Sequence, residues 1–217
     1  MNAVTEKRSA SGMRVLSAGP LSAEFEPETL RSIRWHGHEA IRAISYLVRD
    51  ENWGNYPLQI SGLEIGRADD AFIVTYDAGT VTADGARLTI GVRITGSADG
   101  HLVFEADAVP DADFRTNRCG FCILHPIVGV AGSPVTVEHT DGTVRRAHFP
   151  ALIEPAQPFF DMRAITHEVA PSAFVECRME GDTFEMEDQR NWTDASYKTY
   201  VRPLALPWPY VLPARER

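Results

Sequence analysis

Long apolar runs are missing from the sequence, and so is a recognisable secretory leader. No stretch approaches the roughly 18 consecutive apolar residues that a membrane-spanning helix needs. The opening stretch, MNAVTEKRSASGM, has charges but no apolar segment behind them, which predicts a loose tail instead of a signal peptide. We therefore expect a cytoplasmic protein that does not insert into a membrane.

Positive charge is also scarce. Lys and Arg number 21 against 30 Asp and Glu, which gives a formal net charge of −9. Nucleic acids and anionic membrane surfaces are bound through clustered Lys and Arg, so the sequence disfavours both partners. A small sugar acid stays compatible, because one local Arg or Lys can bind its carboxylate.

Cysteine is rare, and the three cysteines suit a reducing compartment. Cys119 and Cys122 have the C-x-x-C spacing of a redox pair or half a zinc site. A redox pair usually begins a helix, whereas RCGFCILHPI is β-prone, and positions i and i+3 of a strand face opposite ways. No second C-x-x-C is present, so buried structural cysteines are favoured over metal or redox chemistry. We expect no metal and no cofactor.

Familiar catalytic motifs are absent as well: no G-x-G-x-x-G, Walker loop, G-x-S-x-G or H-E-x-x-H occurs. Long helical periodicity is nearly missing, and a short turn near Asp161–Ile165 is the best helix candidate.

The period that is present is two. In RSIRWHGHEAIRAISYLVRD, two alternating runs flank a HGHE turn. In the second run, Ala43, Ser45 and Leu47 are expected on one face of the strand, and Ile44, Tyr46 and Val48 on the other face. Asp-Gly occurs at 84–85, 99–100 and 141–142 between β-prone runs, which is a strong hairpin signal.

Roughly a dozen strands at spacings of about 8–12 residues indicate an all-β protein, a large antiparallel two-sheet β-sandwich. We expect a flexible tail over 1–19, the sandwich domain over 20–202, and a Pro-rich strap or linker over 203–217, because four prolines between Pro203 and Pro213 cannot lie in a central strand.

Polar and aromatic residues are mixed in TFEMEDQRNWTDASYKTY (183–200). Phe184 and Met186 fall on one strand face and Glu185 and Glu187 on the other, before DQRNWTDAS breaks the alternation as a loop or bulge. Sugar sites need this mixture, since carboxylates and amides bind hydroxyls while an aromatic ring covers the C–H face. The alternative is structural: Glu187 or Asp188 forms an ion pair with Arg190, and Trp192 closes the sandwich end. Because Glu187 and Asp188 are adjacent, they would face apart on a regular strand.

The stretch YLVRDENWGNYP (46–57) repeats the same mixture, although Asp50 could simply cap a turn and Trp53 could pack on the sandwich. Both stretches contain Asn-Trp, which could indicate two walls of one cleft. Together they provide the substrate-binding candidates Arg49, Trp53, Asp188, Arg190, Asn191, Trp192, Asp194 and Lys198.

His125, in CILHPIVG, is expected at a strand end on the sandwich rim, where it could act as a general acid or base, or bond to backbone in a turn. His125 and Glu187 are the candidate catalytic bases. The histidines at 36, 38, 139 and 148 are expected to be exposed or at strand ends.

Three segments, VRDENWGNYP, GFCILHPIVGVAG and FEMEDQRNWTDASYKTYVRPL, resemble the N-terminal part of the D-apionate lactonase family. The resemblance implies a sandwich similar to the galactose mutarotase supersandwich. It also implies hydrolysis of the lactone of a branched sugar acid in bacterial apiose breakdown. Members of that family are much longer and continue into a barrel domain, which is therefore a possible partner missing from this chain.

Three functions stay open at this point. The chain could be the sandwich domain of a sugar-acid lactonase, a non-catalytic carbohydrate-binding module, or a mutarotase-like epimerase using His125 and Glu187 on opposite sides of a sugar ring. Whether the chain is an enzyme by itself, and its oligomeric state, are not determined by the sequence.

Overall fold

The computed structural model describes residues 13–192 and 195–216, and these residues are largely β-structure. They form seventeen strands and one short 3-10 helix, η1 (Gln189–Asn191). Within these ranges no helix has the length and apolar character required to cross a bilayer. The all-β prediction is confirmed.

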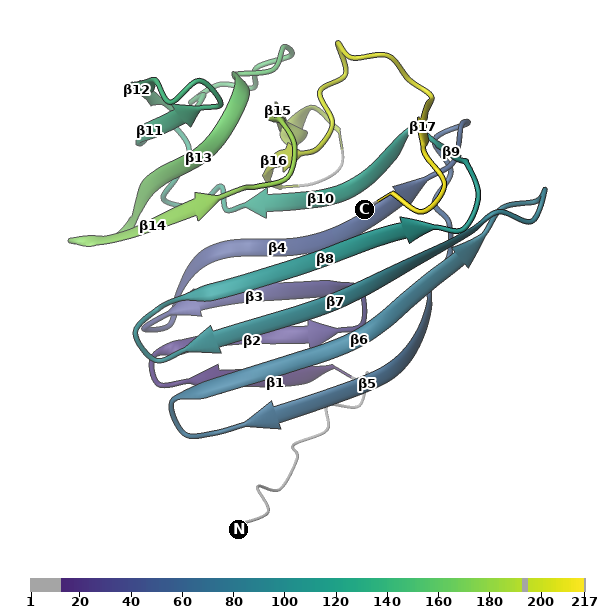
Figure 1. Cartoon of the computed structure of the whole chain (residues 1–217). Coiled ribbons are helices and arrows are strands. Elements are labelled where there is room, and N and C mark those ends of the chain that lie inside the picture. The colour runs from purple at the N-terminus through teal and green to yellow at the C-terminus, as the bar shows by residue number, and fades with distance from the viewer. Residues whose placement is uncertain (1–12, 193–194, 217) are drawn as a thin grey trace.

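Most of the strands belong to two antiparallel sheets (Figure 1). In spatial order, the larger sheet contains β1 (Arg14–Ala18), β2 (Leu21–Glu26), β3 (Thr29–Trp35), β4 (His38–Arg49), β10 (Arg118–His125), β16 (Tyr197–Tyr200), β15 (Phe184–Asp188), β13 (Phe159–Ala170), β11 (Pro134–His139) and β12 (Val144–His148), with β14 (Ala173–Arg178) also paired to β13. The smaller sheet contains β5 (Gln59–Arg67), β6 (Ala71–Val81), β7 (Arg87–Ser97) and β8 (Leu102–Pro110). A separate pair joins β9 (Phe114–Thr116) to β17 (Tyr210–Leu212).

The turn chemistry read from the sequence is confirmed. Asp-Gly at 84–85, 99–100 and 141–142 closes the β6–β7, β7–β8 and β11–β12 hairpins. The three glycines have φ of 98°, 96° and 83°, a region that glycine enters without steric cost. Each preceding aspartate accepts a hydrogen bond from a neighbouring hydroxyl.

Two expectations on element placement are corrected. The helix candidate Asp161–Ile165 lies inside β13, because the backbone there pairs with strands on both sides. The register shifts between Phe159 and Met162, and Asp161 has a positive φ of 50°, so a local bulge produced the turn-like pattern. The sheet also begins at Arg14, inside the segment 1–19 that was expected to be a tail.

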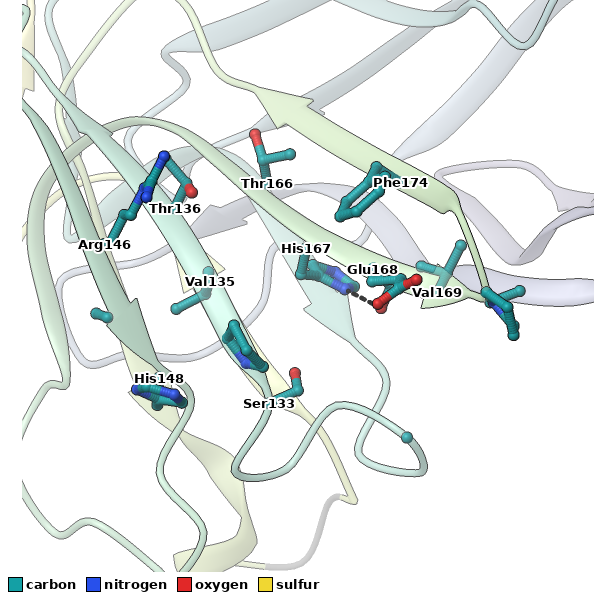
Figure 2. A pocket seen from close by; sticks show the side chains of 15 residues that line it. Ser133, Val135, Thr136, Arg146, His148, Thr166, His167, Glu168, Val169 and Phe174 are labelled. Carbon is teal, nitrogen blue, oxygen red and sulfur yellow. Dashed lines mark hydrogen bonds between the residues drawn. The ribbon is translucent and has the colours of Figure 1, made fainter.

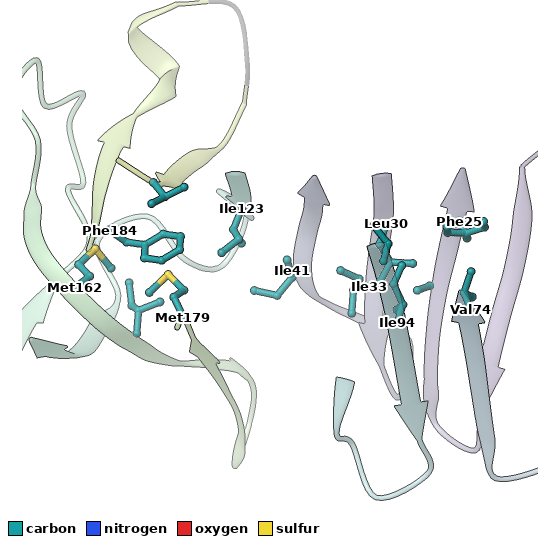
Figure 3. Packing of buried hydrophobic residues seen from close by; sticks show 14 of the residues in the cluster. Phe25, Leu30, Ile33, Ile41, Val74, Ile94, Ile123, Met162, Met179 and Phe184 are labelled. Carbon is teal, nitrogen blue, oxygen red and sulfur yellow. The ribbon is translucent and has the colours of Figure 1, made fainter. Parts of the chain in front are cut away.

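The smaller sheet packs against the half of the larger sheet made by β1–β4. Figure 3 shows Phe25, Leu30 and Ile33 facing Val74 and Ile94 across this layer, and these side chains are at most 4% exposed. The larger sheet continues past the smaller one through β13, β11 and β12 (Figure 1), where a second group of buried side chains, Ile123, Met162, Met179 and Phe184, fills the interior (Figure 3). Among the described residues, part of the larger sheet thus has no second sheet against it.

The face that each side chain takes on β4 and β10 is set by their pairing. Ser45 and Leu47 lie opposite Cys122 and Gly120 on the outer face, as the alternation predicted. Tyr46 lies on the inner face, where its ring packs on Phe121 at 5.2 Å between centroids, and Phe121 packs on Phe104 of β8 at 5.2 Å. Cys119 and Cys122 therefore point to opposite faces and form no disulfide, which fits the structural interpretation.

Candidate functional site

The hairpin formed by β15, η1 and β16 carries most of the predicted site residues. Glu187 lies opposite Lys198, and Asp188 lies opposite Tyr197. Adjacent residues of a strand point to opposite faces, so Glu187 and Asp188 are separated by the sheet, as expected. The two acids therefore have different surroundings.

Asp188 is a buried acid paired with a guanidinium. Arg190 Nε and Nη2 donate to its two carboxylate oxygens at 2.9 and 2.7 Å, and the backbone N–H of Glu154 donates to it at 3.0 Å. Burial by itself would raise the pKa of Asp188, but the bonds from Arg190 and Glu154 outweigh burial and hold the pKa below its usual value.

Arg190 also fixes a neighbouring segment. Its Nη atoms donate to the carbonyl oxygens of Pro150, Ala151 and Leu152 at 2.9–3.3 Å. The Tyr197 hydroxyl donates to the same Pro150 carbonyl at 2.5 Å. These donors are committed to the backbone of 150–152, so the geometry favours the structural ion pair that the sequence left as an alternative.

Glu187 and Lys198 form a second ion pair on the outer face. Lys198 Nζ lies 2.9 Å from one carboxylate oxygen of Glu187, and Trp192 Nε1 donates to the other at 2.9 Å. Trp192 is 69% exposed, so it does not close the sandwich end. An acid, an amine and an exposed indole within hydrogen-bonding distance are groups that can bind a polyhydroxylated molecule.

A row of side chains on the outer face connects this pair with the other Asn-Trp stretch. Lys198 Nζ lies 5.3 Å from the centre of the Tyr200 ring, and the Arg118 guanidinium lies 4.0 Å from the same ring. Arg118 is also 5.3 Å from the Trp53 ring. The sequence suggested that the two Asn-Trp stretches form two walls of one cleft. In the structure, Trp53 and Trp192 are connected only indirectly, through this row of side chains along one sheet face.

Arg118 and Tyr200 are the members of this row that the sequence analysis missed. Arg118 is 6% exposed, its Nε has no hydrogen-bond partner within residues 13–192 and 195–216, and burial lowers its pKa. The Tyr200 hydroxyl donates to Glu185 at 2.7 Å, and burial followed by this carboxylate raises the pKa of the phenol. The sequence did contain one signal for this contact. The alternation in β15 places Glu185 on the face opposite Met186, and Tyr200 lies across from Glu185 on that same face.

His125 ends β10 as predicted, but the expected rim position is not observed because its side chain is fully buried. Its Nε2 lies 2.8 Å from Thr199 Oγ1, and its Nδ1 has no partner among the described residues. Burial, and then the neighbouring His167 ring at 6.3 Å, lowers the pKa of His125 to about 3. His125 pairs with Tyr197 on the inner face, so the sheet separates it from Glu187.

The other predicted residues have mixed positions. Arg49 donates to the carbonyl of Trp53 at 2.9 Å and so fixes the 50–55 turn, in which Asp50 caps the amides of Asn52 and Gly54. Asn191 is exposed, and Asp194 lies outside the described residues. The four remaining predicted histidines, at 36, 38, 139 and 148, are exposed or half-buried.

A hollow of about 930 Å³ opens over β11–β14. Figure 2 shows Thr136, Arg146, Thr166 and Phe174 around it, and the strand register places these four side chains on one face. The adjacent His167 points to the other face, and its buried Nε2 has no partner in the part of the chain that the structure describes. None of the nine predicted site residues that the structure describes lines this hollow. Across the described residues, no three His, Cys, Asp or Glu side chains are grouped to hold a metal ion.

Comparison with known proteins decides the family. The family model "D-apionate lactonase, N-terminal domain" matches residues 1–217. The chain belongs to this family. It is 61% identical over 199 residues to the D-apionate lactonase of Brucella anthropi, and the match covers 92% of this chain but 33% of that protein. The chain therefore spans about a third of the length of this relative. No solved structure matches the chain.

Proposed function

We propose that the chain works as the N-terminal domain of a D-apionate lactonase, an enzyme that hydrolyses the lactone of a sugar acid. The observation that carries the proposal is the 61% identity over 92% of the chain to a protein of that name. The unequal pairing of a four-stranded sheet with a larger one supports the finer assignment to a mutarotase-like supersandwich.

Lactone hydrolysis requires a water, a general base and a group that stabilises the oxyanion. Of the two base candidates, His125 is fully buried, and Glu187 is engaged by Lys198 and Trp192. We therefore assign hydrolysis to the complete enzyme, with residues of the remaining two thirds required. The outer face around Glu187 contributes substrate contacts.

A chimera tests this division. The chain replaces the matching third of the Brucella anthropi lactonase, and acid release from D-apionate lactone is followed for the chimera and for the isolated chain. We expect hydrolysis by the chimera and none by the isolated chain. A folded but inactive chimera would refute the proposed function. Hydrolysis by the isolated chain would refute the division, and Glu187→Gln would then show whether Glu187 is the base.

Carbohydrate binding without turnover is the second candidate function, and the exposed Trp192 next to Glu187 favours it. Calorimetry of the isolated chain with D-apionate should show binding that Trp192→Ala abolishes, whereas Trp208→Ala, an exposed tryptophan elsewhere, should leave it unchanged. Equal loss in both variants would contradict a site at Trp192. The epimerase alternative loses support, because His125 and Glu187 lie on opposite faces of the sheet and cannot flank one sugar ring.

A further inference from the structure

The segment that follows β16 crosses the outer face of the larger sheet as a strap (residues 201–212). Near its start, the N–H of Leu204 donates to Glu185 at 2.9 Å. Further along, the Tyr210 hydroxyl accepts from the N–H of Cys119 at 2.9 Å, and β17 pairs with β9. The strap is thus bound along its length, and Figure 1 shows it running over the end of the sheet from which β10 begins.

The side of the strap that faces solvent is apolar. We call Leu204, Trp208 and Val211 the strap surface; they are 39%, 51% and 49% exposed. Trp208 extends this surface to the 50–55 turn, because its ring packs edge-on against Trp53 at 5.3 Å between centroids. Single exposed apolar residues are common, but three on one short bound segment beside a half-buried tryptophan form a patch of the kind that marks an interaction site.

We propose that the strap surface is the docking site for the remaining two thirds of the lactonase polypeptide, an inference that rests on the proposed function. The relative has about twice this chain's length outside the matched region, since the match covers 33% of it. The family model describes an N-terminal domain. The remaining two thirds of the relative therefore come after the segment that corresponds to the strap. The described chain reaches Glu216, five residues after Val211 of the strap surface, and the N–H of Arg215 donates to the carbonyl oxygen of Pro110 at 2.8 Å. A domain that follows as in that relative would therefore start close to Val211.

Radical footprinting of tryptophan tests the proposal directly. The isolated chain and the chimera described above are oxidised under the same conditions, and modification of Trp208 is compared with that of the half-buried Trp35 on β3. We expect Trp208 to react about fivefold less in the chimera, as its exposed fraction falls from 51% towards that of an interface core residue, while Trp35 changes little. Equal reactivity of Trp208 in the two proteins would overturn the proposal. Protection of Trp208 in the isolated chain through dimer formation would also overturn it, because the occupant would then be a second copy.

A matched pair of variants gives an independent measurement. Val211 and Val103 are 49% and 47% exposed, and Val103 lies on β8 of the smaller sheet. In the isolated chain Val211→Asp and Val103→Asp should affect the melting temperature equally. In the chimera Val211→Asp should lower it more than Val103→Asp does, because the charge at position 211 would be buried at the interface. Equal effects in the chimera would refute docking at the strap surface. Both readouts are independent of lactone hydrolysis, so an inactive chimera with protected Trp208 would reject the proposed function and keep this inference.

Discussion

The buried His125 predicts a specific loss of stability in mild acid. The histidine has a pKa of about 3 in the folded chain against an ordinary 6.5, so the unfolded chain binds a proton that the folded chain excludes. Its contribution is complete above pH 6.5 and is lost as the pH falls towards 3. Integration between pH 7.5 and pH 4.5 gives a loss of roughly 2.7 kcal/mol in the free energy of unfolding from this one side chain.

The matched variant removes both partners of the buried hydrogen bond. His125→Leu with Thr199→Val leaves neither Nε2 nor Oγ1 without a partner, which keeps the cost at neutral pH small. Urea unfolding of the wild type and the double variant at a series of pH values then isolates His125. His167, whose pKa is also lowered, first by burial, is present in both proteins, and so are carboxylates such as Asp188.

The expected result is a gap between the two proteins that changes by roughly 2–3 kcal/mol across this pH range, with the wild type losing more. Parallel curves would show that His125 is not kept neutral in the folded chain. That outcome would refute the reasoning, because a fully buried His125 with no charged partner among the described residues must have a lowered pKa.

Two further predictions concern stability at neutral pH, measured by urea unfolding. Arg190→Met should lower the free energy of unfolding by about 3 kcal/mol, because it leaves Asp188 buried without its cation. Arg118→Met should change it by less than about 1 kcal/mol, because no carboxylate of the described residues forms an ion pair with this buried guanidinium. Similar losses in both variants would contradict this. Gly120→Ala should lower the free energy of unfolding by about 3 kcal/mol, because a Cβ there would lie 2.1 Å from a methyl carbon of Val201 and the φ of 151° disfavours side chains. A near-neutral result would show that the segment around Val201 relaxes easily.

Local features of the fold were predictable because they depend on neighbouring residues. Asp-Gly at 141–142 specifies a tight turn, and the alternation of Ile44, Tyr46 and Val48 specifies a strand face, whatever the rest of the chain does. The same local reasoning failed at Asp161, where a bulge inside a long strand has the sequence pattern of a turn.

The candidate site was predictable only in part. The sequence indicated that Glu187 and Asp188 face apart, and it left the Arg190 ion pair open as an alternative. It could not show which acid faces solvent, because that depends on which face of β15 the 150–154 segment covers. Arg118 and Tyr200 were missed because their contact joins residues 82 positions apart in the sequence.

The sequence alone therefore determined the class of the fold, the hairpins and the family resemblance, since these follow from short-range patterns and from residue identity. Only the tertiary structure decided that His125 is buried, that the sheet separates it from Glu187, and that an apolar strap lies over the outer face. These properties depend on strand order and on which face each neighbouring layer covers, and both arise from contacts between residues distant in the chain.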